Sequence, residues 1–225
     1  MHRSCARLLM VAHGTASPAG SATTAALIDA ARARRRGTQV DLCFLDVASP
    51  RLVDALDERP TVVVPLLLST GYHVQTDIPA VVASFAEVRV AAHLGPDPLV
   101  VDALVDRLAV LPGGARSTVL VAAGSSRPEA VEECRAAAGE LQHRLSGHGP
   151  KHPVTVATMA DDIEAVFAAL PQPYQVATYL LAEGAFVDRL ARAAHDSARV
   201  AAPLGVHPAL VELVWKRYDD AQRTR

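Results

Sequence analysis

The sequence predicts an α/β protein of two similar domains, each a parallel sheet flanked by helices, which arose by internal duplication. Short continuous apolar runs alternate with longer helical patterns, as is typical of parallel strands that are buried on both faces. Half of the 225 residues are hydrophobic but only 4% are aromatic, which favours closely packed α/β layers over an aromatic-rich β-sandwich. In addition, three short segments of the first half recur in the second half.

In the first half we expect four strands and four helices. The strands are expected at 7–12, 38–44, 61–67 and 88–93, and the helices at about 21–36, at about 50–58, from about 78 and at 98–109. Gly37 is expected to end the first helix. Pro79 suits the first turn of the third helix, because its φ is preset and it has no N–H to satisfy.

The recurring segments define the expected duplication. They keep their order in the second half: 9–14 recurs as 119–124, 63–71 as 176–184, and 93–98 as 203–208. The offset is 110 residues for the first and third pairs (124 minus 14) and 113 for the second (184 minus 71). We therefore expect a domain at 1–110, a linker at 111–117 and a second domain at 118–225. The last helix is expected at 208–217, with Trp215 packed against the body of the protein.

Charge argues against a nucleic-acid partner. The formal net charge is −2, whereas nucleic acid is bound by a concentrated basic surface. The basic run Arg32–Arg36 is interpreted as solvated cations at the end of a helix. The alternative, that these arginines help to attract an anionic small molecule, stays open.

Cysteine spacing and the amino-terminal segment indicate a soluble cytoplasmic enzyme. The three cysteines, Cys5, Cys43 and Cys134, lie far apart without a CxxC pair, which excludes a zinc ribbon or a typical iron–sulfur site and suits a reducing compartment. The chain shows no apolar core of a signal peptide and no transmembrane run, so no membrane partner is expected.

Two histidines follow buried strands directly. His13 ends the first strand, and His73 follows the third within a loop that contains Gly71. The carboxyl ends of parallel strands form the ligand crevice of α/β proteins, where neutral imidazoles suit a transiently held transition metal or proton abstraction. Their counterparts are Ala123 and Phe186, so neither histidine is needed for the fold. A pair of hydrogen-bonded surface histidines is the alternative.

The sequence lacks the residues that other kinds of active site would require. A histidine phosphatase would have Arg before the His-Gly pair, where this chain has Ala12. The nucleophile elbow GxSxG does not occur, nor does a Walker or GxGxxG loop, which argues against a serine hydrolase and against nucleotides.

Segments 11–15 (Val-Ala-His-Gly-Thr) and 64–79 (Val-Pro-Leu-Leu-Leu-Ser-Thr-Gly-Tyr-His-Val-Gln-Thr-Asp-Ile-Pro) resemble the sirohydrochlorin chelatase family, the small class II chelatases. Segments 44–50 and 94–98 fit further parts of the family pattern. The resemblance covers 7–110 closely and 118–217 more loosely. It implies the chelatase-like fold and nucleotide-independent insertion of Fe²⁺ or Co²⁺ into sirohydrochlorin or a related anionic tetrapyrrole, for siroheme or cobalamin biosynthesis. The alternative is a non-catalytic tetrapyrrole or metal carrier.

Carried over to this chain, the resemblance makes His13 and His73 the catalytic, metal-binding and proton-accepting pair. His93 is either a third metal ligand or a loop residue with a hydrogen-bonding role. Asp46 stands where the family often has Glu, one methylene longer. The substrate pocket is expected to contain Gly14, Thr15, Asp46, Ser69, Thr70, Gly71 and Tyr72. Amide groups at the helix starts after residues 15 and 77, together with Arg51, are expected to meet the substrate carboxylates.

The resemblance also sets the expected partners. The divalent metal (Fe²⁺, Co²⁺ or Ni²⁺) is a substrate rather than a permanently bound cofactor, and the protein is a monomer or a homodimer. Asp77 is interpreted as a helix cap, with orientation of a histidine as the alternative. The other histidines are interpreted as surface residues: His2, His143, His148, His152, His195 and His207.

Overall fold

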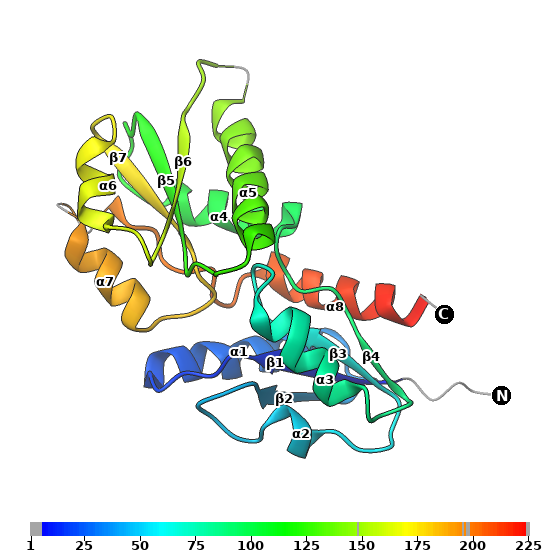
Figure 1. The fold of residues 1–225 in the computed structure, drawn as a ribbon. Helices are drawn as coiled ribbons and strands as arrows, with labels where there is room; N and C mark the ends of the chain where they lie inside the picture. Colours follow the sequence, from blue (N-terminus) through cyan, green and yellow to red (C-terminus); the bar gives the residue numbers. More distant parts are fainter. Residues whose placement is uncertain (1–5, 148, 195, 197–198, 224–225) are drawn as a thin grey trace. The chain divides into compact units, whose positions relative to one another are not determined.

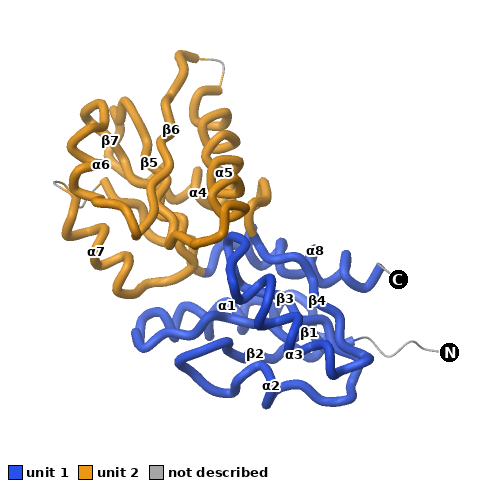
Figure 2. The backbone as a smooth tube through the Cα atoms, viewed as in Figure 1, with its two compact units in different colours: residues 1–94, 206–225 blue, residues 95–205 orange. Residues whose placement is uncertain are grey.

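The computed structural model describes residues 6–147, 149–194, 196 and 199–223, and the chain forms two compact units (Figures 1 and 2). Unit 1 comprises residues 1–94 and 206–225, and unit 2 comprises residues 95–205. Each unit is an α/β sandwich around a parallel sheet, as the alternating pattern predicts. Within the described ranges, no helix is long and apolar enough to cross a membrane.

Unit 1 contains a four-stranded parallel sheet with the order β2-β1-β3-β4. Its strands are β1 (Arg7–Ala12), β2 (Val40–Phe44), β3 (Thr61–Pro65) and β4 (Val88–Val90). Its helices are α1 (Pro18–Arg34), α2 (Leu52–Ala55), the π-helical turn η1 (His73–Asp77), α3 (Ile78–Val82) and α8 (Pro208–Arg223). Helices α1 and α8 pack together, as do α2 and α3. Every residue of β1 and β3 is buried, as expected for central strands covered on both faces.

Among its described residues, unit 2 repeats this plan with one strand fewer. Its sheet has the order β6-β5-β7, with β5 (Ser117–Ala122), β6 (Val154–Thr158) and β7 (Tyr174–Tyr179). An isolated parallel bridge joins Val176 of β7 to Val200. The helices are α4 (Pro98–Ala109), α5 (Pro128–Ser146), α6 (Ile163–Ala169) and α7 (Ala185–Ala193).

The final helices of the two repeats are exchanged between the units. Helix α4 ends the first repeat in sequence but packs on β7 and α5 of unit 2, and α8 packs on β3 and β4 of unit 1. Equivalent arginines, 110 positions apart, fix this exchange. Arg217 of α8 donates to the Leu94 carbonyl (3.2 Å), and Arg107 of α4 donates to the Leu204 carbonyl (2.8 Å). The compact units therefore differ from the repeats expected at 1–110 and 118–225.

Most expected elements occur, with shifted ends. Helix α1 begins three residues earlier than expected, because the Ser17 hydroxyl accepts a hydrogen bond from the Gly20 amide (3.3 Å) and Pro18 fits the first turn. It ends at Arg34, before Gly37, so Gly37 does not cap it. As expected, Trp215 is buried: its indole N–H donates to the Ala31 carbonyl (3.2 Å).

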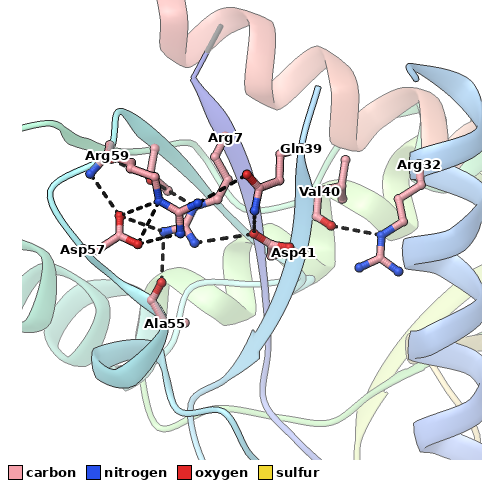
Figure 3. Close-up of polar contacts among 9 residues, drawn as sticks. Arg7, Arg32, Gln39, Val40, Asp41, Ala55, Asp57 and Arg59 are labelled. Carbon is pink, nitrogen blue, oxygen red and sulfur yellow. Dashed lines mark hydrogen bonds and ion pairs between the residues drawn. The ribbon is translucent and has the colours of Figure 1, made fainter. Parts of the chain in front are cut away.

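A polar network ties together the amino ends of the unit 1 strands (Figure 3). Arg7, the first residue of β1, is 6% exposed; it donates to the Ala55 carbonyl (2.9 Å) and lies 3.5 Å from Asp41 and 3.8 Å from Asp57. Arg59 makes a 2.6 Å ion pair with Asp57. This network joins segments that are distant in sequence on the sheet edge opposite to His13.

The basic run at the end of α1 lies at this same edge. The Arg32 guanidinium donates to the carbonyl of Val40, the first residue of β2 (3.0 Å), and Arg35 forms two hydrogen bonds with Asp219 (2.7 and 2.6 Å). The six-residue strand β1 separates this edge from the one bearing His13 by about 20 Å. These contacts favour the helix-end interpretation over attraction of a ligand to the histidine edge.

We expect Asp57 to make stability depend on acid pH. Its hydrogen bonds with Arg59 lower the pKa of Asp57 from 3.8 to about 2. Between these two values the unfolded chain binds the additional proton, so stability rises with pH in this range and is lost as the pH falls. Urea unfolding from pH 5 to pH 2 should show a shallower acid slope for Asp57→Asn than for the unmodified protein. Asp29→Asn, which removes a helix-surface pair with Arg32, is the control; an unchanged slope in Asp57→Asn contradicts this expectation.

Candidate active site

His13 and His73 meet at the carboxyl edge of the unit 1 sheet. His13 directly follows β1, and His73 begins η1 after the neighbouring parallel strand β3. The centroids of the two imidazole rings are 4.8 Å apart, with an angle of 86° between the ring planes. The expected convergence of the two histidines is therefore present as an edge-to-face ring contact.

The segment that carries His73 is a π-helical turn. The Ile78 amide donates to the His73 carbonyl, which closes the wide i→i+5 turn, and helix α3 continues from it with Pro79 in its first turn. The helical conformation thus begins before residue 78, where the sequence predicted a loop. Such turns are rare and occur frequently at functional sites.

Asp77 contacts His73 rather than capping a helix. Its Oδ2 lies 2.6 Å from His73 Nδ1, and its side chain makes no capping hydrogen bond. The predicted cap is wrong, because Asp77 has helical φ and ψ (−68°, −49°) within a continuous helical segment. The anion site expected at a helix start after residue 77 is also wrong: the Ile78 amide is paired and Pro79 has no N–H.

A loop after β2 brings Asp46 to the same edge. The Asp46 amide donates to the His13 carbonyl (2.9 Å). Its carboxylate accepts from the Val47 amide (2.8 Å), lies 3.9 Å from the Arg51 guanidinium, and is 61% exposed. Asp46 is thus adjacent to His13 through the backbone, while its carboxylate is directed toward the loop and Arg51.

Gly14 permits this close approach of the two loops. Its φ is +100°, and a Cβ there would lie 2.0 Å from the Asp46 carbonyl oxygen. The sequence placed Gly14 in the substrate pocket, and its close neighbour in the structure is the Asp46 backbone. Val47, next to Asp46, adopts a φ of +64°, which is an outlier for a β-branched residue.

A hollow of about 370 Å³ opens beside His73. Asp46, Arg51 and Asp77 line it together with His73, and apolar side chains form the rest of its wall: Leu45, Leu52, Val53, Ala80 and Val81. Neither the apolar wall nor the positive φ of Val47 is evident from the sequence. Val53, one of the apolar residues of this wall, is 56% exposed, and this exposure depends on tertiary structure.

The predicted third histidine lies in a hydrogen-bonded loop. The His93 Nε2 is 3.2 Å from the Thr70 hydroxyl, and Arg217 donates to the His93 carbonyl (2.9 Å). Thr70 is only 9% exposed. These contacts favour the hydrogen-bonding alternative for His93, and they give Thr70 a partner within the protein. Among the described residues, no group of three or more His, Cys, Asp or Glu side chains is arranged to hold a metal ion.

The remaining predicted pocket residues lie within a few positions of His13 or His73 in the sequence. The Thr15 hydroxyl accepts from the Ser17 amide (3.0 Å) and so shapes the entry into α1. Ser69 and Gly71 are half-buried in the loop before η1, and the Gly71 carbonyl accepts from the Gln75 amide (3.1 Å). Tyr72 is 57% exposed immediately before His73, so its ring is accessible to a ligand.

Three of the six other histidines can be placed. His143 is exposed, as expected. His152 and His207 are half-buried instead: His152 Nε2 lies 2.8 Å from the Thr118 hydroxyl, and His207 Nδ1 accepts from the Ala209 amide (3.2 Å) at the start of α8. These two histidines are therefore partly exposed residues that have a hydrogen-bond partner within the protein. His2, His148 and His195 lie outside the described residues.

The two described cysteines are core residues. Burial raises the pKa of Cys43 to about 12 and that of Cys134 to about 11, so both remain neutral thiols. Since metals are bound by thiolates, neither is suited to be a ligand. Cys5 lies outside the described residues.

The corresponding edge of unit 2 keeps the backbone but not the imidazoles. Gly124 has a φ of +92°, close to the +100° of Gly14, and it follows Ala123 where Gly14 follows His13. Phe186, in the first turn of α7, occupies the position that matches His73 and is 48% exposed. The same strand-end geometry thus forms without either histidine.

Comparison with known proteins agrees with the duplicated fold. The chain superposes on SirB from Bacillus subtilis with Fe³⁺ (TM-score 0.78, 21% identity, 96% of this chain and 95% of that chain). It also superposes on SirB from Bacillus subtilis subspecies spizizenii in complex with cobalt (0.79, 20%, 97% and 96%). A third match is CbiX, described as the terminal enzyme of siroheme biosynthesis in denitrifying bacteria (0.73, 21%, 96% and 99%). No curated protein matches the sequence significantly.

The family assignment rests on the sequence itself. The model of the CbiX family matches residues 7–111 and again residues 117–221. These two matches coincide with the two repeats inferred from the recurring segments, and together they cover nearly the whole chain. The chain therefore belongs to the CbiX family and contains two copies of its domain.

Proposed function

We propose that the protein is a nucleotide-independent chelatase, a lyase that inserts Fe²⁺ or Co²⁺ into sirohydrochlorin or a related tetrapyrrole for siroheme or cobalamin biosynthesis. The observation that carries the proposal is the contact between His13 and His73 at adjacent strand ends. Membership of the CbiX family and the fold shared with metal-bound SirB support it.

The imidazole pair suits a metal that must leave the protein. Structural metal sites usually have four protein ligands, whereas among the described residues no group of three or more His, Cys, Asp or Glu side chains could hold a metal ion. Two imidazoles bind a divalent ion and leave coordination positions open for the pyrrole nitrogens. They discriminate weakly among Fe²⁺, Co²⁺ and Ni²⁺, so the proposal extends to all three metals.

The same histidines serve as bases. Metal insertion removes two pyrrole N–H protons, and a neutral imidazole accepts a proton near neutral pH. Because the rings of His13 and His73 are in contact, they present their nitrogens to one small region of the macrocycle. In this proposal each histidine first binds the ion and then accepts a proton as the ion passes to the ring.

The hollow beside His73 supplies contacts for the substrate. Its apolar wall suits the hydrocarbon part of a macrocycle, and Arg51 provides a cation for a substrate carboxylate. Tyr72 is 57% exposed, so its ring is available to stack on the macrocycle. At the start of α1 the Ser17 and Gly20 amides already donate to side chains, whereas Arg51 lines the hollow itself.

A cytoplasmic location is part of this proposal. Fe²⁺ persists in a reducing compartment, where buried thiols such as Cys43 and Cys134 also remain reduced. The protein would act as a monomer or a homodimer, with the metal and the anionic tetrapyrrole as its partners.

The test is the rate of metal insertion. Sirohydrochlorin is mixed with Co²⁺ or Fe²⁺ under anaerobic conditions, and its absorbance is followed with and without the protein. The proposal expects acceleration that scales with protein concentration. A spontaneous rate combined with spectral evidence of ring binding would instead identify a tetrapyrrole carrier.

A further inference from the structure

We infer that Asp77 is a positioning residue: it holds His73 in the tautomer that carries a proton on Nδ1, and so directs the lone pair of Nε2 toward the metal and the substrate. The inference deepens the proposed function, because it names the reactive nitrogen of the site. In this role Asp77 is neither a metal ligand nor the base. It acts through His73 alone.

The first evidence is the contact between the two side chains. The 2.6 Å distance between Asp77 Oδ2 and His73 Nδ1 lies at the short end of the range for charge-assisted hydrogen bonds. An ionised carboxylate only accepts hydrogen bonds, so Nδ1 must carry the proton. In the neutral ring Nε2 is then an acceptor, which is the form that binds a metal or takes a pyrrole proton.

The second evidence is the backbone that sets this contact. His73 and Asp77 are the first and last residues of η1, and the hydrogen bond from the Ile78 amide to the His73 carbonyl closes the turn around them. The separation of the two side chains is therefore fixed by the turn, and little conformational entropy is lost when they meet. Short-range restraint of this kind makes the contact more persistent than a pair between distant loops.

The third evidence is that Asp77 has no capping role. Its side chain makes no capping hydrogen bond with α3, although it stands immediately before that helix. Asp77 lines the hollow together with His73. The His73 ring also contacts the His13 ring, with 4.8 Å between the ring centroids and 86° between the ring planes, so it has both Asp77 and His13 as neighbours. A carboxylate that orients a metal-binding histidine is a recurrent arrangement in metalloproteins.

Imidazole ¹⁵N NMR of the metal-free protein tests the inference without any need for activity. At a pH where the imidazole is neutral, the unmodified protein should show His73 protonated on Nδ1 and not on Nε2. Asp77→Ala should shift His73 toward the other tautomer. Asp77→Asn should largely retain the original tautomer, because its amide oxygen still accepts from Nδ1.

The matched control is Gln75→Ala, which changes an exposed side chain of the same turn and should leave the His73 signals unchanged. If the chelatase activity is present, Asp77→Ala should lower kcat by about 10- to 100-fold with little change in the tetrapyrrole KM, and Asp77→Asn should recover much of it. An inactive unmodified protein with the expected tautomer would reject the proposed function alone. His73 protonated on Nε2 in the unmodified protein, or a tautomer that is unchanged in both Asp77 variants, would overturn the inference.

Discussion

Replacing His73 by alanine is expected to reduce metal insertion to the spontaneous rate while the protein stays folded. The variant loses a metal ligand and a base at once, and a single general base is commonly worth about 10²- to 10⁴-fold in rate. The fold should tolerate the change, because 30% of the His73 side chain is exposed and Phe186 occupies the matching position in unit 2.

Activity and folding are measured on the same samples. Absorbance of the tetrapyrrole gives the insertion rate, and circular dichroism with thermal unfolding reports the fold. His143→Ala removes an exposed imidazole from α5 and should match the unmodified protein in both measurements. An unfolded His73→Ala variant would show that the histidine is structural, and a folded variant with the full rate would remove His73 from the chemistry.

Gly14→Ala is expected to destabilise the protein strongly and to abolish activity. Its φ of +100° is strained for any side chain, which alone costs on the order of 1–3 kcal/mol. The added Cβ would also lie 2.0 Å from the Asp46 carbonyl oxygen, so one of the two loops must move. Since the first loop carries His13, this movement would separate the imidazole pair. Urea unfolding measures the loss of stability, and the insertion assay measures the loss of activity.

Two other Gly→Ala variants are expected to lose less stability than Gly14→Ala and serve as comparisons. Gly124→Ala has a similar φ of +92°, but its Cβ would lie 3.2 Å from the Thr158 side chain rather than against a backbone oxygen. Gly37→Ala meets no atom within 4 Å and should be neutral or stabilising by up to about 1 kcal/mol. The free energy of unfolding should therefore fall most in Gly14→Ala, less in Gly124→Ala and not in Gly37→Ala. Equal stability of the Gly14 and Gly37 variants would contradict the close contact with Asp46.

The pattern of apolar residues was sufficient to predict the parallel sheets, and the recurring segments were sufficient to predict the duplication. Continuous apolar runs identified β1 and β3, whose residues are all buried, because a central parallel strand meets helices on both faces. Comparison of the two repeats also singled out His13 and His73. Their adjacency followed from the topology, because the carboxyl ends of parallel strands lie at one edge of the sheet and β1 and β3 are neighbours in it.

Other features depend on tertiary structure and escaped prediction. The exchange of α4 and α8 leaves no local signal, because each helix has the same apolar pattern whichever sheet it covers. The π-helical turn depends on a single i→i+5 hydrogen bond, so the sequence suggested a loop and a cap at Asp77 where the structure has an Asp77–His73 contact. The positive φ of Val47 was also hidden, because β-branched residues rarely adopt it.

The most direct test of the central claim, that the imidazole pair carries the chemistry as a unit, is the initial rate of Co²⁺ insertion in His13→Ala, His73→Ala and the double variant. Residues that act together give strongly non-additive losses. We expect each single variant to fall to nearly the spontaneous rate and the double variant to be no slower than either. Single variants that retain most of the rate, or losses that multiply in the double variant, would contradict the claim.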